Sequence, residues 1–240
     1  MLNNVRLLTH SSIRIELENG KIVYVDPYEI QGEPNDADYI LITHPHYDHF
    51  SPKDIAKVMK LACPDGYDEE NDSYNQEDEY YDGADFDEEN ANEPTKVFMP
   101  YDSAQDALGL EIINVEPSED YSEDDFYVET TYAYNVGKDF HPKDKGWVGY
   151  LIDTGSETIY IAGDTDANED IMDIECDVAM VPIGGTYTMN PSEAAEFVNT
   201  IKPTLAIPTH YGSVVGEEEY AEAFEDLLNP EITVLYKKEY

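Results

Sequence analysis

The first part of the chain alternates between apolar and polar positions, which is the period expected of β-strands. The apolar residues between positions 13 and 17 fall on one face, the turn sequence Asn19-Gly20 follows, and an apolar run then covers 22–25. Residues 5–26 are therefore predicted to form two strands joined by a hairpin. The second strand ends at Asp26, so a carboxylate is expected at its tip.

Short apolar runs bounded by turn residues recur along the rest of the chain and predict further strands. They lie at 39–43, 96–99, 111–115, 126–134, 147–153, 158–162, 177–183, 205–207 and 232–235. Several of these runs stop just before a histidine, an aspartate or an asparagine. Sites in α/β proteins collect at strand ends, so these polar residues are candidates for chemistry.

Two stretches combine helical spacing of apolar residues with helix start signals. Ser51-Pro52 supplies an N-cap and a proline at the first helical position, which predicts a helix over 52–62. Asn190 and Glu193 can form a capping box for a second helix, which Pro203 ends. A last helix is predicted near 217–228. Helices interleaved with short strands in 240 residues indicate a single α/β domain covering 1–240.

Charge is the most unusual feature of the composition. The chain has 54 Asp and Glu residues against 13 Lys and Arg residues, which gives a formal net charge of −41. Such a surface repels nucleic acid backbones and anionic lipids, so no nucleic acid partner is expected. One explanation is a salt-rich cytoplasm, in which molar ionic strength shortens the Debye length to about 3 Å. The other explanation is a local acidic insertion, and the sequence supports both.

The insertion lies at about 64–94, where aliphatic residues are few and no period is sustained. Residues 65–93 contain fourteen Asp and Glu and no Lys or Arg, yet the rest of the chain still has forty acidic residues against thirteen basic ones. We interpret this segment as an inserted loop or flexible flap. A lid or a cation-binding arm is the alternative.

The sequence predicts neither a membrane segment nor a disulfide framework. No apolar run approaches the roughly 18 residues of a membrane span, and the residues after Met1 do not form a leader, so no membrane association and a cytoplasmic location are expected. Cys63 and Cys176 are the two cysteines, and they lack the paired spacing of a thiolate metal site.

The segment from Thr43 to Phe50 carries the strongest chemical signal in the chain. It places three histidines and an aspartate within six residues, namely His44, His46, Asp48 and His49. His44 and His46 leave the same face of an extended segment, and the Asp-His pair follows in the turn before the next helix. Imidazole together with carboxylate favours zinc, manganese or iron over calcium or magnesium. The segment therefore predicts a metal site.

Together with motifs elsewhere, this segment resembles the metallo-β-lactamase superfamily, in the branch of metal-dependent hydrolases that includes ascorbate-6-phosphate lactonase-like proteins. The likeness covers most of the chain, and its motifs occur in the order that the family shows. They are Leu8-Thr9-His10-Ser11-Ser12, Val25-Asp26-Pro27, the segment from His44 to His49, Ala162-Gly163-Asp164-Thr165, Pro182-Ile183-Gly184-Gly185-Thr186 and Pro208-Thr209-His210-Tyr211. The resemblance implies a four-layer αββα sandwich as the fold.

The resemblance also implies a dinuclear metal site. In the family pattern, His44 and His46 hold one ion, Asp48, His49 and His210 hold the second, and Asp164 bridges both. Two cations about 3.5–4 Å apart can share a water and lower its pKa toward neutrality, which generates a hydroxide nucleophile. Two divalent metal ions are therefore the expected cofactors, with zinc favoured and manganese or iron as alternatives.

The remaining ligand of the first ion is open between two residues. In many relatives a histidine ends the strand equivalent to 126–134, but here that strand runs into Asn135, and the nearest histidine is His141. We choose His141 as the ligand, with Asn135 as a substitute ligand or a substrate contact. His10 resembles a histidine that approaches the pocket of these hydrolases and could orient substrate or exchange protons. Asp26 fits a carboxylate that accepts a ring N–H from a ligating histidine.

A hydrolase is the leading functional prediction. A metal-bridging hydroxide would attack an ester, lactone or phosphodiester bond of a small anionic or neutral substrate, with Asp48, His10 and Asn135 as the catalytic candidates. Lactone opening and phosphodiester cleavage both fit, and a lysine cluster around His141 could attract phosphate or carboxylate. The alternative function is a non-catalytic metal-binding or sensing protein on the same fold. A homo-oligomer is compatible with the sequence.

Overall fold

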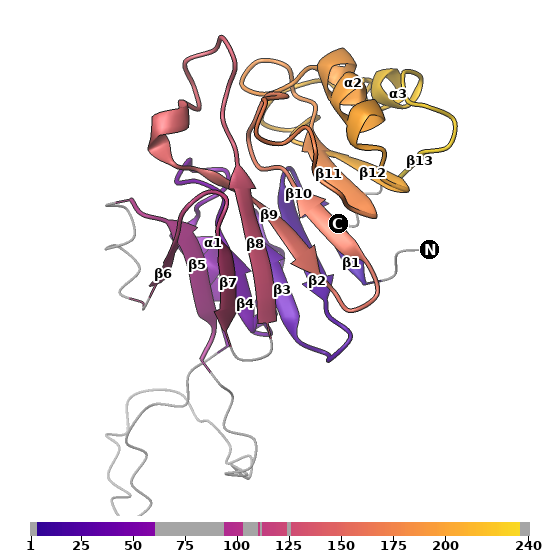
Figure 1. The fold of residues 1–240 in the computed structure, drawn as a ribbon. Coiled ribbons are helices and arrows are strands. Elements are labelled where there is room, and N and C mark those ends of the chain that lie inside the picture. The colour runs from indigo at the N-terminus through magenta and orange to yellow at the C-terminus, as the bar shows by residue number, and fades with distance from the viewer. Residues whose placement is uncertain (1–3, 61–93, 103–109, 111, 124–125, 236–240) are drawn as a thin grey trace, which may run out of the picture.

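The computed structural model describes residues 4–60, 94–102, 110, 112–123 and 126–235. Within them the chain forms two mixed β-sheets that pack face to face, with helices on both outer surfaces (Figure 1). The predicted αββα sandwich is therefore confirmed. The predicted acidic insertion falls almost entirely on 61–93, outside the described residues. No helix in the described ranges is long and apolar enough to cross a membrane.

The first sheet contains the strands from the N-terminal half of the chain. Its order is β1 (Val5–Thr9), β2 (Ser12–Glu16), β3 (Ile22–Val25), β4 (Tyr39–Leu41), β5 (Lys96–Pro100) and β6 (Ile112–Val115). The first three strands pair antiparallel, and β3 to β6 pair parallel. Helix α1 (Pro52–Val58) packs against this sheet, with Ile55 and Val58 in an apolar cluster beside Tyr24 and Ile40.

The second sheet contains the remaining strands. Its order is β13 (Thr233–Val234), β12 (Leu205–Thr209), β11 (Val178–Pro182), β10 (Thr158–Ile161), β9 (Val148–Asp153), β8 (Phe126–Tyr132) and β7 (Asp120–Glu123). β10 to β13 are parallel, and β9 runs antiparallel to both β8 and β10. Helices α2 (Pro191–Ile201) and α3 (Tyr220–Glu225) cover its outer face, where Phe197 and Phe224 are fully buried.

Strand direction explains where the polar residues gather. Because β2 reverses the chain between β1 and β3, both of these strands run the same way as β4. In the second sheet β8, β10 and β12 likewise share one direction. The carboxyl ends of strands that run in one direction lie at one edge of a sheet, which is where α/β proteins place their sites.

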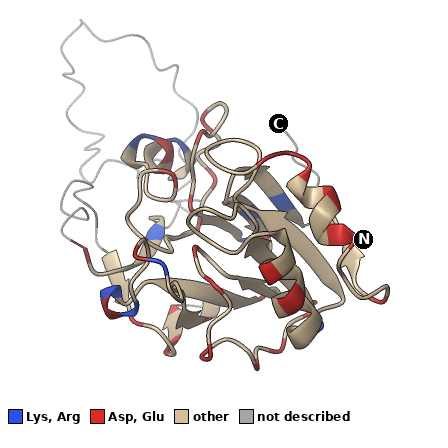
Figure 2. Ribbon diagram, turned by 90° about the horizontal axis from the view of Figure 1, so that it is seen from above, with Lys and Arg blue, Asp and Glu red and all other residues tan. Residues whose placement is uncertain are grey.

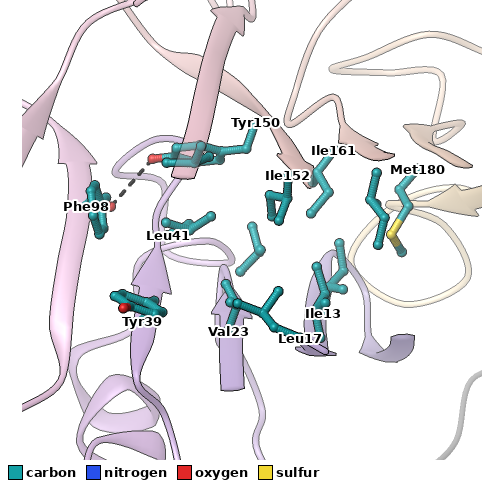
Figure 3. Packing of buried hydrophobic residues seen from close by; sticks show 14 of the residues in the cluster. Ile13, Leu17, Val23, Tyr39, Leu41, Phe98, Tyr150, Ile152, Ile161 and Met180 are labelled. Carbon is teal, nitrogen blue, oxygen red and sulfur yellow. Dashed lines mark hydrogen bonds between the residues drawn. The ribbon is translucent and has the colours of Figure 1, made fainter. Parts of the chain in front are cut away.

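The core between the two sheets holds these edges in place. Ile13, Val23 and Leu41 from the first sheet face Ile152 and Ile161 from the second (Figure 3). Each of these five side chains is at most 4% exposed. A polar group within this core is paired across the layers, because Tyr150 donates its hydroxyl to the Ile42 carbonyl at 2.8 Å. Burial raises the pKa of Tyr150 well above its ordinary value, so the phenol remains a donor.

Two strands were not predicted, and both have mixed patterns. Residues 5–26 form three strands instead of two, because Val5–Thr9 adds an antiparallel strand at the sheet edge with only Leu7 fully buried. Asp120–Glu123 forms β7, an edge strand that has no buried residue and pairs with β8. Edge strands of this kind lack the apolar alternation that identifies strands in a sequence.

Two helices are shorter than predicted. The helix expected over 52–62 ends at Val58, because Met59 turns to an extended conformation and bridges to Ala37. The backbone of Lys60 then donates to the Thr95 hydroxyl at 2.9 Å, so hydrogen bonds outside the helix replace those of another turn. The helix expected near 217–228 covers only Tyr220–Glu225 and has no side-chain cap at its start.

Candidate metal centre

The predicted site residues follow the strand ends, and three of them have unusual backbone geometry. His10 follows β1, Asp26 follows β3 and His210 follows β12, with φ angles of 45°, 45° and 57°. The left-handed region costs a non-glycine residue of order 1–3 kcal/mol and is tolerated where the surroundings impose it, often at functional sites. The fold therefore holds these three residues in a strained backbone conformation that directs their side chains.

One cluster brings together His44, His46 and His141. The Nε2 atom of His44 lies 3.0 Å from Nδ1 of His46, and one nitrogen from each of the three rings lies within 4.8 Å of the others. The Trp147 ring packs against all three, with centroid distances of 5.1, 4.9 and 5.4 Å. Burial lowers the pKa of His44 and of His46, which keeps both rings neutral and able to donate lone pairs.

A second cluster contains Asp48, His49 and His210, with His10 beside them. The Asp48 Oδ2 atom lies 4.0 Å from His49 Nε2, 3.7 Å from His210 Nε2 and 3.2 Å from His10 Nε2. Burial alone would raise the pKa of Asp48, but the hydrogen bond from His10 and the charge of His49 lower it below its ordinary value. Asp48 is therefore a carboxylate at neutral pH.

Asp164 lies between the two clusters. Its Oδ1 atom is 3.3 Å from His49 Nε2, and its Oδ2 atom is 3.3 Å from His141 Nε2 and 3.0 Å from His210 Nε2. The residue is 4% exposed. Burial would raise its pKa, but the neighbouring imidazoles, His210 and His49 foremost, hold the pKa well below the usual range. One buried carboxylate thus faces histidines from both clusters.

Asp26 and Thr43 contact the histidines of the motif through the ring nitrogens that face away from Asp164. Asp26 accepts from the Thr43 backbone at 2.8 Å and the Thr43 hydroxyl at 2.7 Å, and its Oδ2 lies 2.7 Å from His49 Nδ1. The predicted contact between Asp26 and a ring N–H of the motif is confirmed. It leaves His49 Nε2 facing Asp164. Thr43, whose hydroxyl also lies 3.0 Å from His44 Nδ1, was not given a role, although its place next to the histidine motif was a signal.

Asn135 and His141 lie side by side and do not occupy equivalent positions. The Asn135 Oδ1 atom accepts from the His141 backbone at 3.0 Å and lies 3.2 Å from His141 Nδ1. The Asn135 amide donates to the Tyr187 carbonyl at 2.9 Å. Both ends of the Asn135 side chain are therefore paired within the protein, while the Nε2 atom of His141 faces Asp164.

His10 is buried and belongs to the second cluster, and its Nε2 atom makes no hydrogen bond of good geometry within the described residues. Nε2 faces Asp48, and Nδ1 lies 3.1 Å from the hydroxyl of Ser213. Burial lowers the pKa of His10 to about 4, so the ring is neutral at pH 7. A facing carboxylate favours the tautomer with the proton on Nε2, and in that tautomer the Ser213 hydroxyl can donate to Nδ1. No pattern in the sequence indicated Ser213, which comes from a loop 203 residues away.

The donor set fits metal ions. The Nε2 atoms of four histidines and the Oδ1 atom of Asp164 are buried and make no hydrogen bond of good geometry within the described residues; the histidines are His10, His49, His141 and His210. Buried polar atoms in proteins are nearly always paired, so these orphaned atoms at one point require a ligand. Imidazole and carboxylate in this ratio suit zinc, iron or manganese.

The lysines beside His141 are paired with carboxylates. Lys138 lies 2.5 Å from Asp166 and also donates to the Thr188 carbonyl at 2.7 Å. Lys143 lies 2.5 Å from Asp170. These contacts fix the loop that carries His141, and they neutralise two of the charges that the sequence suggested for anion binding.

Comparison with known proteins agrees with this geometry. A family model described as the beta-lactamase superfamily domain matches residues 4–210. The chain belongs to the metallo-β-lactamase superfamily. A UPF0173 metal-dependent hydrolase of Thermoplasma acidophilum is 28% identical over 88% of this chain and 85% of its own length. Another from Methanopyrus kandleri is 30% identical over 90% of this chain and 87% of its own.

A solved structure of another protein shares the fold. The crystal structure of a candidate metal-dependent hydrolase from Parabacteroides distasonis matches with a TM-score of 0.70 and 23% identity, over 98% of this chain and 93% of that one. Membership of this superfamily implies divalent metal ions as cofactors, in agreement with the orphaned donor atoms.

Proposed function

We propose that this superfamily member is a metal-dependent hydrolase that acts on an ester, lactone or phosphodiester bond of a small substrate. The observation that carries the proposal is the position of Asp164, whose two oxygens face His49, His141 and His210 at 3.0–3.3 Å. A single buried carboxylate between two groups of histidines is the arrangement needed to hold two cations close together.

The chain offers one ligand set for each ion. His44, His46 and His141 would hold the first ion, Asp48, His49 and His210 would hold the second, and Asp164 would contact both. A pair of divalent ions supplies a deprotonated water at neutral pH and polarises the oxygen of the bond to be cleaved. Zinc is the ion we expect, with manganese or iron as alternatives.

The surrounding residues prepare these ligands. Asp26 fixes the tautomer of His49, and Asn135 holds His141 by its backbone and by its ring. Such partners orient the ring and raise its basicity. Neutral His10 lies 3.2 Å from Asp48 and 3.1 Å from the Ser213 hydroxyl, which places it to orient the carboxylate and to add an imidazole to the second cluster.

Metal analysis and a substrate screen on the same preparations test the proposal. The purified chain is loaded with zinc, manganese or iron, and each form is assayed with simple esters, lactones and bis-p-nitrophenyl phosphate. We expect about two ions per chain and turnover of at least one class. Full metal occupancy with no turnover of any class would contradict the hydrolase and favour the metal-binding alternative.

A further inference from the structure

Four aromatic side chains surround the candidate metal centre, and we call them the aromatic rim. They are Tyr28, Tyr47, Phe140 and Tyr187, and each comes from a different loop. Tyr47 is 66% exposed, Phe140 45% and Tyr187 38%, while Tyr28 is partly buried. Large aromatic groups left exposed together next to a site mark a binding surface more often than a lone exposed residue does.

The rim is attached to the centre on both sides. On one side, the Tyr28 ring lies 6.5 Å from the His10 ring and 6.2 Å from the Tyr47 ring, with an edge contact in each case. On the other side, Phe140 packs edge-on against Tyr187 at 4.7 Å and directly precedes His141 in the chain. The rim therefore begins beside one group of candidate ligands and ends beside the other.

The chain itself joins the rim to the candidate ligands. Tyr47 lies between His46 and Asp48, so this ring is attached directly to candidate ligands of both ions.

The loops that carry the rim are fixed by buried or paired carboxylates. Asp54, in the first turn of α1, accepts from the backbone of Glu29 at 3.0 Å and of Ile30 at 3.2 Å, which holds the loop containing Tyr28. On the other side, Lys138 joins Asp166 to the Thr188 carbonyl and so ties the Phe140 loop to the Tyr187 loop. These contacts hold the loops of Tyr28, Phe140 and Tyr187 in place.

Charge around the rim indicates what it binds. Glu29 is exposed next to Tyr28, and Asp48 directly follows Tyr47, so a carboxylate stands beside each of these two rings in the chain. Lys138 and Lys143 are held by carboxylates. An anionic substituent placed here would meet acidic groups and aromatic faces, which disfavour it, whereas an uncharged ring gains edge-to-face contacts.

We propose that the aromatic rim binds a flat, uncharged aryl group of the substrate, next to the bond that is cleaved. This substrate class rests on the proposed function for its reaction, but the binding contact can be measured without turnover. The rim thus selects the substituent, while the metal centre binds the reacting group.

Phenylphosphonate and methylphosphonate test the contact directly, because they share the metal-binding group and differ in the ring. Their dissociation constants are measured by calorimetry on the metal-loaded protein. We expect phenylphosphonate to bind about threefold to tenfold more tightly, the range of one aromatic contact. The preference should disappear in the double variant Tyr47→Ala, Tyr187→Ala and persist in Tyr47→Phe, Tyr187→Phe, with metal content measured for each.

Tyr127→Ala is the matched control, because Tyr127 is 44% exposed and lies near the start of β8, at the end of that strand away from Asn135. It should leave the phosphonate preference unchanged. Equal affinities for the two phosphonates in the wild-type protein would overturn the proposal. A wild-type dimer that the double alanine variant converts to a monomer, together with equal affinities, would instead identify the rim as a contact between copies.

A hydrolysis arm separates this inference from the proposed function. Methyl phenylacetate and methyl propanoate have the same non-aromatic leaving group and differ in a ring close to the ester bond. If neither is cleaved but the phosphonate preference holds, the rim is supported and the hydrolase is not. If both are cleaved with equal kcat/KM and the phosphonates bind equally, the hydrolase is supported and the rim is overturned.

Discussion

Replacing Asp26 with asparagine should weaken metal binding even though Asp26 is not a ligand. Asp26 is 1% exposed, and three groups meet its two oxygens, namely the Thr43 N–H, the Thr43 hydroxyl and Nδ1 of His49. Asparagine has the same shape but only one acceptor oxygen. If that oxygen keeps the Thr43 N–H, the amide NH₂ faces His49 Nδ1, so His49 must accept there and carry its proton on Nε2.

The size of the effect follows from this change of tautomer. A proton on Nε2 blocks the atom that faces Asp164, and loss of such an orienting partner typically costs about 10-fold to 100-fold in metal affinity. Folding of the metal-free chain also loses a charged hydrogen bond, which is worth about 1.5–3 kcal/mol. For a chain of this length each kcal/mol shifts Tm by roughly 2–4 °C.

Metal affinity and Tm measured on the same protein separate the two effects. The control is Asp36→Asn, because Asp36 accepts from Arg14 at 2.8 Å and Tyr24 at 2.9 Å and belongs to neither histidine cluster. The control should lower Tm and leave metal affinity unchanged. Wild-type metal affinity in Asp26→Asn, with only a lowered Tm, would show that Asp26 is structural and refute the tautomer argument.

Three further predictions concern ligands, salt and pH. His141→Ala should retain about one metal ion per chain, whereas Asn135→Ala should retain two at saturating metal, with weaker affinity. The metal content of both variants is measured by plasma emission. The reverse result would make Asn135 the ligand. Tm should rise between low and molar potassium chloride, since 54 acidic residues face 13 basic ones, and a flat Tm would contradict the role of self-repulsion. Metal affinity should fall as the pH drops. Burial opposes the charged form of His49, but Asp164 and Asp26 raise its pKa well above the ordinary value. The proton on His49 therefore competes with the metal, and each displaced proton lowers the affinity about tenfold per pH unit. Calorimetric titrations between pH 8 and pH 6 that give one affinity would contradict this.

The acidity itself is spread over the described chain. Figure 2 shows Asp and Glu along the helices and loops on several sides of the fold, with few Lys and Arg among them. The residues outside 65–93 hold forty acidic against thirteen basic residues. Deleting 65–93 should therefore reduce the salt response without abolishing it.

Three of the candidate ligands, His44, Asp164 and His210, follow or closely follow apolar runs in the sequence. His44 and His210 come directly after or close to strands whose residues are buried, so the sequence marks both the strand and its end. Strand direction then brings the ends together, which is a property of the fold that the family resemblance supplied. β1 and β7 were missed for the opposite reason, since edge strands bury few residues and leave no alternating pattern.

Contacts between loops could not be predicted. Ser213 meets His10, and Tyr47 meets Tyr28, only because separate loops fold over one edge of the sandwich. No periodicity relates such residues, and the sequence shows only that each is polar or aromatic. The choice between His141 and Asn135 was open for the same reason, since both stand near one strand end and only their contacts distinguish them.

Anomalous diffraction from crystals grown with zinc would locate the metal ions. We expect two peaks about 3.5–4 Å apart, one beside His44, His46 and His141 and the other beside Asp48, His49 and His210, with Asp164 contacting both. A single peak, or peaks only at surface carboxylates of this acidic chain, would contradict this assignment.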